Sequence, residues 1–518
     1  MKKLFLVALL LLSINILKSQ EQNISNGTIF EGEPYIAINP ANTQNIVVAW
    51  MGYVYNNGSG LTIKVKSSFD GGNNWSSTLF MPHVVSTYKS ADPSLAFDNN
   101  GNLFLSYIDY RENPDSGGVY LLKSTNGGLS WGNPIKMIDM YADGNKLPID
   151  RPWLVINPSG DKLFLTTKPA PWIAAPNRPY FLSSADSGQT WTPWRYIDTT
   201  NFLVGSLITQ PMAAPTCSGN LFQTIYPSYL TSQSVYPRYI IASTSDNGLH
   251  FTYNTVINIL SAANNDSAKL GYRLIHNPAN TNHLAFIYPG GTSGDIDIMM
   301  TESTNGGANW STPIRINDDN TNNGKMQDMI WADFDTDGDI IITWRDRRSA
   351  TGNGYAQASE FYAAYRSHDS TQFSPNFKLS NLVNFNTILL EKGNDFMSTE
   401  LLNDTLYSVY GTTKDGSLDI WFLKTSAITG ISTSIKSLEH KQETIFVSPN
   451  PSSGNFLITA PNNIQNITII NVKGETVHTG IYNSNNIAID LKNKPNGMYN
   501  LVIKTNSSTY TRKVLINK

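Results

Sequence analysis

The stretch Ser68-Phe69-Asp70-Gly71-Gly72-Asn73-Asn74-Trp75 decides the fold of this 518-residue chain, because its pattern returns four more times. The pattern is Ser/Thr-x-Asp/Asn-x-Gly-x-x-Trp/Phe, and the later copies occupy residues 124–131, 184–191, 244–251 and 303–310. Measured from the Asp or Asn of each copy, the steps are 56, 60, 60 and 59 residues. Self-similarity at one such period indicates a repeat architecture.

Each copy has the chemistry of a tight hairpin turn. The Asp or Asn side chain and the hydroxyl can accept hydrogen bonds from nearby backbone N–H groups. The glycine allows a backbone conformation that a Cβ would penalise, and the final aromatic residue folds back as an apolar plug. We therefore interpret the Asp and Asn residues of these turns as structural: Asp70, Asn126, Asp186, Asp246 and Asn305.

A second repeated unit, an apolar strand, a turn and another apolar strand, lies between these octets. Seven such hairpins occur between residues 35 and 410, and their turns carry Asn-Pro, Asn-Gly, Ser-Gly or Asp-Gly. The seventh unit lacks one strand, which the segment near residues 24–30 could supply. Closing a ring with strands from both ends hides the sheet edges. The sequence thus predicts an all-β propeller of seven four-stranded blades, with six blades as the alternative.

The repeated octet resembles the Asp box, or BNR repeat, of the sialidase superfamily of β-propellers. In that family the boxes join the third and fourth strands of each blade, on the face away from the active site. The best-known sialidases have six blades, which is why six remains the alternative. The resemblance implies a propeller over residues 21–426 and a ligand site on the opposite face, near the starts of the innermost strands.

The N-terminus has the features of a secretory signal peptide over residues 1–20. Met1-Lys2-Lys3 is followed by a short apolar run that begins at Leu4. The run is too short and too polar for a membrane span, so no transmembrane span is expected in the mature chain. A cysteine that could carry a lipid anchor does not occur near the cleavage region.

The C-terminal segment, residues 445–518, follows a Ser/Thr-rich linker at residues 427–444. It opens with Pro449-Asn450-Pro451-Ser452-Ser453-Gly454, contains Asn496-Gly497-Met498-Tyr499 and ends in a basic and apolar strand. These motifs resemble the type A sorting domain of the type IX secretion system, a small β-sandwich. The resemblance implies the type IX machinery as a partner, and a protein that is released or attached at the outer cell surface.

Composition excludes some functions. A net charge of -3 and 15% charged residues argue against an electrostatic nucleic-acid binder. The single cysteine, Cys217, allows no intrachain disulfide and is expected to be buried. The seven histidines show no zinc spacing, so no metal ligand is assigned. Calcium is the one cofactor left open, because Asp333-x-Asp335-x-Asp337-Gly338-Asp339 imitates a calcium loop; Trp344 stands where its Glu is expected, which favours a plain turn.

Charged residues collect where a propeller would place a ligand site. Those next to the innermost strands are Glu33, Asp92, Asp150, Arg151, Tyr272 with Arg273, Asp328 and Asp395. Those at the ends of second strands are Arg111, Asp346, Arg347 and Arg348. Clustered carboxylates raise one another's pKa or attract a cation, and arginine forks bind carboxylate, sulfate or phosphate groups. The alternative is that these residues cap strands or join neighbouring blades.

Sialidases of this superfamily use an arginine triad, a Tyr nucleophile with a Glu, and an Asp acid. Their first arginine belongs to a Phe/Tyr-Arg-Ile-Pro motif, but here the position reads Gly32-Glu33-Pro34-Tyr35-Ile36. Arg151, Arg273 and Arg348 could form a rearranged triad, with Tyr272 as nucleophile and Asp92 or Asp150 as acid.

Two functions therefore remain open. One is a secreted enzyme that hydrolyses an acidic glycan or surface polysaccharide. The other is a non-catalytic propeller that acts as an adhesin or a protein-interaction module. Trp172 and Tyr355 lie in long loops on the expected ligand face, where exposed aromatic rings could stack on sugars.

Overall fold

The computed structural model describes residues 20–27, 30–55, 59–111, 115–200, 212–228, 238–257, 271–292, 295–385, 394–428, 445–505 and 509–518. The chain divides into two compact units, Met1–Thr433 and Ser434–Lys518. The described residues contain 3-10 helix η1 (Gly144–Lys146) and otherwise only strands as regular elements. The all-β prediction is confirmed. The signal peptide, Gln20 apart, and most of the linker lie outside the described residues and stay predictions.

The described residues of the first unit form seven four-stranded antiparallel sheets, the number of blades counted in the sequence. In three of them the strands are β2 (Glu31–Ile38), β3 (Ile46–Tyr55), β4 (Ser59–Ser68), β5 (Leu79–Phe80); β6 (Lys89–Phe97), β7 (Leu103–Tyr110), β8 (Gly117–Ser124), β9 (Ile135–Asp139); and β10 (Asp150–Ile156), β11 (Leu163–Lys168), β12 (Tyr180–Ser184), β13 (Arg195–Tyr196). In the next two they are β14 (Ala214–Ser218), β15 (Leu221–Ser228), β16 (Arg238–Thr244), β17 (Thr252–Ile257); and β18 (Arg273–His276), β19 (Leu284–Thr292), β20 (Asp295–Ser303), β21 (Ile314–Arg315). In the last two they are β22 (Gln327–Phe334), β23 (Ile340–Asp346), β24 (Glu360–Arg366), β25 (Phe377–Lys378); and β26 (Ser398–Leu402), β27 (Thr405–Thr412), β28 (Asp419–Ser426), β1 (Gln20–Asn23).

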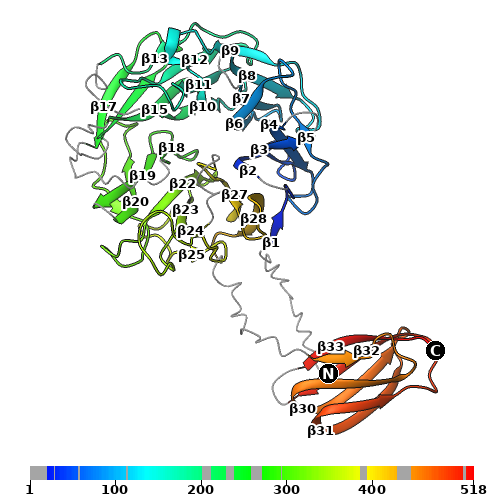
Figure 1. The fold of residues 1–518 in the computed structure, drawn as a ribbon. Helices are drawn as coiled ribbons and strands as arrows, with labels where there is room; N and C mark the ends of the chain where they lie inside the picture. Colours follow the sequence, from blue (N-terminus) through cyan, green and yellow to red (C-terminus); the bar gives the residue numbers. More distant parts are fainter. Residues whose placement is uncertain are drawn as a thin grey trace, which may run out of the picture. The chain divides into compact units, whose positions relative to one another are not determined.

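The sheets form a closed ring (Figure 1). The first strands contact one another in the order β2, β6, β10, β14, β18, β22 and β26, and β26 contacts β2. The last sheet is completed by β1, which pairs with β28 at the register Gln22 to Phe422. This closing strand lies a few residues before the expected segment at 24–30, where Phe30 only forms a parallel bridge to Leu418. Pairing of β1 with β28 covers a sheet edge that would otherwise be unpaired and closes the ring of the propeller.

The five Asp-box octets form turns with one shared set of hydrogen bonds. In the first copy the Ser68 hydroxyl accepts from the backbone N–H of Gly72 at 2.9 Å. The Asp70 carboxylate accepts from the N–H of Asn74 at 2.8 Å. The equivalent bonds recur in the other four copies. Trp75 then packs edge-on against Phe422 of the neighbouring blade, with ring centroids 5.0 Å apart. The octet is therefore both a turn and a wedge between blades.

The second unit is a small five-stranded sheet with its own apolar core. Its strands are β29 (Phe446–Ser448), β30 (Asn455–Asn471), β31 (Thr476–Asp490), β32 (Gly497–Thr505) and β33 (Thr509–Ile516). The long strand β30 pairs with β29 in its first half, with β32 in its second half, and with β31 through most of its length. Inward residues of this sheet include Ile467 and Ile469 of β30 and Leu501 of β32, all fully buried.

Candidate functional site

The innermost strands position the site because they all begin on the same face of the ring. The five Asp-box turns each follow the third strand of their sheet, so they lie at the end opposite to the starts of the innermost strands. Three innermost strands start with the same irregularity: a bulge with a charged residue at positive φ, followed by proline. These residues are Glu33 (φ 54°), Asp92 (φ 56°) and Arg151 (φ 49°). Non-glycine residues rarely adopt this conformation, and such strain is concentrated at functional sites.

These bulges bring together five charged residues, here called the central cluster: Glu33, Asp92, Asp150, Arg151 and Asp395. The first four are at most 8% exposed. The cluster spans the ring, because Arg151 of the third blade donates through Nη2 to Asp395 Oδ2 of the last blade at 3.0 Å. The sequence predicted each of these residues as part of a site, and the structure places them in one group.

Glu33 and Asp92 form a carboxyl pair within the central cluster. Burial raises the pKa of Glu33 well above its usual range. The charges of Asp92 and Asp395, and a side-chain hydrogen bond with Asp92, raise it further, while Arg151 opposes them. Burial and the neighbouring carboxylates therefore favour the protonated form of Glu33, and its buried Oε2 atom has no hydrogen-bond partner among the described residues.

Arg151 organises the pair. Its backbone N–H donates to Asp92 Oδ2 at 2.9 Å, and its Nη1 contacts the Met212 sulfur at 3.2 Å. Burial lowers the pKa of Arg151, but the surrounding carboxylates, with Asp395 first, outweigh burial and raise it. The Arg151 guanidinium therefore stays charged within a cluster that contains four carboxyl groups.

Asp150 has a separate cation, Lys168, which the sequence analysis did not identify. Lys168 is 1% exposed, and its Nζ donates to Asp150 Oδ2. Burial raises the pKa of Asp150 to about 6 although Lys168 opposes it, and burial lowers the pKa of Lys168. Both shifts show that burial outweighs the attraction within the pair. The sequence signal that could have identified Lys168 is its place at the end of β11, next to the start of β10 at Asp150-Arg151-Pro152.

Asp328 and Arg347, predicted as ligand-binding residues, lie in a saturated ion network. Asp328 accepts from Arg345 Nε at 2.8 Å and Nη2 at 2.6 Å, and from Arg347 Nη1 at 3.1 Å. Arg347 also donates to the Tyr355 and Met326 carbonyl oxygens. Both guanidiniums lie against the Tyr355 ring. The predicted sugar-stacking ring of Tyr355 is therefore engaged by these arginines.

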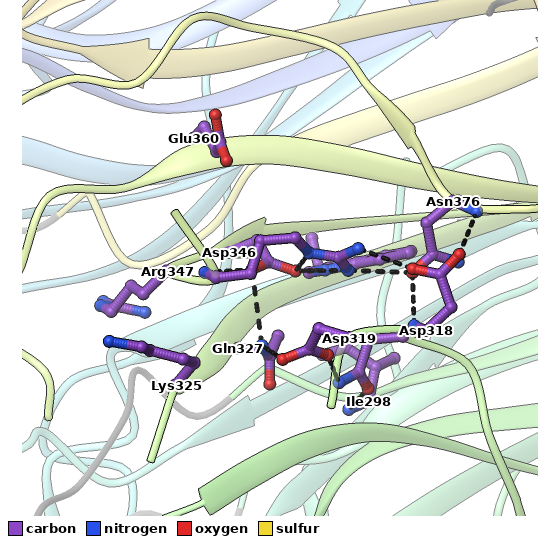
Figure 2. A network of polar contacts seen from close by, with 12 residues as sticks. Ile298, Asp318, Asp319, Lys325, Gln327, Asp346, Arg347, Glu360 and Asn376 are labelled. Atoms are coloured by element: carbon purple, nitrogen blue, oxygen red, sulfur yellow. Dashed lines mark hydrogen bonds and ion pairs between the residues drawn. The ribbon is translucent and has the colours of Figure 1, made fainter. Parts of the chain in front are cut away.

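Asp346 and Arg348 belong to a second network of the same blade (Figure 2). Asp346 Oδ2 accepts from Arg348 Nε at 3.0 Å and Nη2 at 2.8 Å. Arg348 also donates to Asp318 at 2.6 Å and to Asn376 at 2.9 Å. Asp318 in turn accepts from the backbone N–H of Asn376, as Figure 2 shows. These partners come from the loops of two neighbouring blades. The network fits the alternative of inter-blade ion pairing that the sequence left open.

The proposed rearranged triad is dispersed among different partners. Arg151 binds Asp395, whereas Arg348 binds Asp346 and Asp318. Arg273 stacks on the Trp331 ring, with its guanidinium carbon 3.8 Å from the ring centroid. The structure does not bring these three arginines onto shared acceptors within the described residues.

Tyr272 and Arg111 are each held by a partner outside the carboxyl pair. The Tyr272 hydroxyl donates to the Met212 carbonyl oxygen, and burial raises its pKa. A hydroxyl held in this way is a poor nucleophile. Arg111 is half-exposed and donates to Asp115 at 2.6 Å.

An aromatic group closes the ring centre next to the central cluster. Tyr35, Trp153, Trp331 and Phe396 are each at most 8% exposed. Their rings contact one another at centroid distances of 5.0–6.3 Å. Tyr35, Trp153 and Phe396 each follow a residue of the central cluster by one to three positions, and Trp331 follows Asp328 by three. This apolar wall explains why the neighbouring carboxyls are desolvated.

The acidic loop considered for calcium is a turn on the Asp-box face. Asp335 Oδ1 accepts from the backbone N–H of Asp339 at 3.0 Å, as Asp98 Oδ1 does from Asn102 at 2.8 Å in the second blade. Carboxylates of Asp335 and Asp339 approach that of Asp404 closely enough for shared cation ligation. The repeated turn geometry accounts for Asp335 without an ion.

Two further polar groups have structural explanations. The Cys217 thiol is half-buried, donates to the Ile156 carbonyl oxygen at 3.2 Å and has its pKa raised to about 12 by burial. His83, Ser90 and Asp109 approach one another at 2.8–3.0 Å. Ser90 and Asp109 both contact the same His83 nitrogen, Nδ1, which is not the relay of a nucleophilic triad.

Comparison with protein families identifies two regions of the chain. Residues 111–332 match the BNR repeat-like domain, and residues 446–517 match the secretion system C-terminal sorting domain. The chain thus carries a BNR-repeat propeller and a sorting domain for type IX export to the cell surface or outside. A helix long and apolar enough to cross a membrane is not found in the described part of the chain.

Solved structures with some likeness include glycan-acting propellers. The Hadza microbial sialidase Hz136 is 12% identical, with 77% of this chain and 66% of that chain covered and a TM-score of 0.41. The GH93 α-L-arabinofuranosidase of Fusarium graminearum is 9% identical (79% and 98% covered, TM-score 0.43). The Trypanosoma rangeli sialidase is 10% identical (96% and 89% covered, TM-score 0.40). These values are too low to carry over an activity. The sequence matches no curated protein.

Proposed function

We propose that this exported propeller binds a neutral glycan at the central cluster and hydrolyses its glycosidic bond. The observation that carries the proposal is the Glu33 and Asp92 carboxyl pair, with the buried Glu33 Oε2 atom unpartnered. Glycoside hydrolysis in most families needs two carboxyl groups, one as a proton donor and one as a base or nucleophile. An exported protein of this fold, with several carboxyl groups in its central cluster, fits that chemistry.

Glu33 takes the role of the general acid. Its raised pKa keeps a proton available at neutral pH, which a leaving glycosidic oxygen requires. Asp92 hydrogen-bonds the Glu33 side chain and is itself held by the Arg151 backbone N–H, so it positions the acid, and Asp150 and Asp395 are the cluster carboxyls left for the role of base. Arg151 itself is fixed through Asp395, so the group is positioned before a ligand arrives.

The charge of the central cluster favours a neutral glycan over the acidic glycan expected from the sequence. Four carboxyl groups face one guanidinium and one ammonium, those of Arg151 and Lys168. Arg345, Arg347 and Arg348 are engaged by the carboxylates of Asp328 and Asp346, whereas Arg273 stacks on the Trp331 ring. A carboxylate on the ligand would therefore meet repulsion, whereas sugar hydroxyls can both donate and accept hydrogen bonds.

Reducing-sugar release tests the proposal. The purified protein is incubated with neutral arabinan, xylan and galactan, and with a sialylated glycoprotein and polygalacturonate. Release from a neutral polysaccharide is expected, and Glu33→Gln should lower it about 10²- to 10⁴-fold. Arg111→Ala, a charge change on the same face away from the cluster, should leave it unchanged. Release only from the acidic substrates, or full activity of Glu33→Gln, would contradict the assignment. Binding to neutral glycans without release would support the non-catalytic alternative.

A further inference from the structure

Trp172 is a large aromatic side chain that the fold holds in solvent. It is 54% exposed and lies on the loop between β11 and β12. Because β10 starts on the face of the central cluster and β11 runs back to that face, this loop lies on the same face. The third blade also contributes Asp150 and Arg151 to the central cluster. Large exposed aromatics on positioned loops are informative, because burial is their usual state.

The loop is anchored on both sides of Trp172. Ala170 is fully buried, and its backbone N–H donates to the Leu147 carbonyl oxygen at 2.9 Å. Ile173 packs against the apolar core of the second and third blades. The Asn177 side chain, 1% exposed, donates to the Ile173 carbonyl oxygen at 3.0 Å. The backbone next to Trp172 is thus fixed while its ring is left outside.

A lysine ties this loop to the segment that leads into β10. Lys146 Nζ donates to the carbonyl oxygens of Ala174 at 3.1 Å and Pro176 at 2.8 Å, and to Asn177 Oδ1 at 3.1 Å. The same segment carries Tyr141, whose side chain is 42% exposed. Three protein acceptors on one ammonium group make a rigid connection between the two loops.

The two loops also lie within reach of the central cluster. Trp172 lies two residues after Ala170, and the backbone of Ala170 is hydrogen-bonded to that of Leu147. Leu147 in turn lies four residues before Arg151. Extended-chain geometry therefore limits the backbone separation of Trp172 and Arg151 to about 25 Å. A glycan chain of several rings can cover such a span.

We propose that Trp172, with Tyr141 on the connected loop, forms a stacking subsite for sugar rings remote from the bond at the central cluster. The inference rests on the proposed function and adds its specificity: the ligand is an extended neutral glycan rather than a single terminal sugar. An aromatic face offers apolar area to the C–H face of a pyranose or furanose ring without needing charge. Its exposure leaves the ring open to a ligand, and its fixed backbone reduces the entropy lost on binding.

A length series tests the subsite. The full-length protein and its variants are applied to an array of neutral arabino-, xylo- and galacto-oligosaccharides of one to eight rings. Trp172→Ala should weaken binding of the long oligomers about tenfold and leave one- and two-ring sugars unchanged. Tyr141→Ala should have a smaller effect of the same kind. Phe69→Ala is the matched control, because Phe69 is 46% exposed but belongs to an Asp-box turn on the opposite face.

The outcomes separate the subsite from the proposed function. If Trp172→Ala binds every length as the unsubstituted protein does, the subsite is refuted while binding at the central cluster stands. An equal loss for short and long sugars also refutes it, because the effect would then not be that of a remote ring. If the unsubstituted protein binds and cleaves none of these glycans, both proposals fail. Unchanged melting temperatures of the variants show that each loss is local.

Discussion

The central cluster and the Asp328 network present two solutions to the same problem, charged groups buried beside innermost strands. Asp328 faces two guanidiniums, Arg345 and Arg347, which together lower its pKa although burial opposes them. Burial raises the pKa of Glu33, and the charges raise it further because Glu33 faces two carboxylates and only one guanidinium. One carboxyl is fully neutralised by the protein, and the other is not.

The difference distinguishes scaffold from site. A buried carboxylate held by two arginines gains from being charged and has little left to offer a ligand. A buried acid with an unpartnered oxygen destabilises the fold, and such groups persist at functional positions. The sequence pattern at the two places is alike, an acid at a strand start. The number of cations within reach separates them.

The largest effect is expected from breaking the Asp328 network. Asp328→Asn leaves two buried guanidiniums without their carboxylate and should lower the free energy of unfolding by about 3–5 kcal/mol. Because the Asp328 pKa is lowered, its contribution is present above the ordinary aspartate range and is lost only as the pH falls through the lowered pKa. Urea denaturation at pH 7 measures it. An unchanged midpoint would show that Arg345 and Arg347 find other acceptors.

A smaller loss is expected at the Asp-box face. Gly72 has φ +89°, and an added Cβ would lie 2.4 Å from the Phe422 ring of the neighbouring blade. Gly72→Ala should therefore lower the free energy of unfolding by about 2–3 kcal/mol, from backbone strain and overpacking together. Gly219→Ala is the control, since Gly219 has φ +58° with open space around it. Equal thermal shifts for both variants would mean that wedging between blades contributes nothing.

The smallest effect is expected at Arg111. Its ion pair with Asp115 is half-exposed on both sides, so water screens it. Arg111→Ala should leave the melting temperature and glycan release unchanged in a thermal scan and the reducing-sugar assay. A marked loss of release would return Arg111 to the site that the sequence analysis assigned it to and extend the site beyond the central cluster.

The sequence predicted the fold well because the Asp box repeats at a period close to 60 residues and marks the turn after the third strand in five of the seven described sheets. The closing strand was misplaced because β1 reads Gln20-Glu21-Gln22-Asn23, without the apolar pattern of an inner strand. Its pairing depends on hydrogen bonds to β28 rather than on burial of its own side chains. Backbone pairing of this kind leaves little trace in the sequence.

The site was predictable only in part. Glu33, Asp92 and Arg151 follow one another at 59-residue steps, each before a proline, and this pattern marks the bulges that gather them. The partners of each charge could not be read in the same way. Arg345 reaches Asp328 across its own hairpin, and Lys168 reaches Asp150 from the end of a second strand. Such pairings depend on side-chain reach and burial, which residue spacing does not specify.

The pH dependence of stability for Glu33→Gln tests the central claim most directly, since it needs no substrate. Because the pKa of Glu33 is raised in the folded protein, the folded protein keeps a proton on this carboxyl that the unfolded chain loses above pH 4.5, the ordinary glutamate value. Stability of the unsubstituted protein is therefore reduced as the pH rises through that range. Glu33→Gln should match it near pH 4 and become the more stable protein towards pH 8, by about 1–3 kcal/mol. A difference that is constant with pH, or a variant that is less stable at pH 8, would show that the Glu33 carboxyl is ionised and satisfied, and would contradict the account.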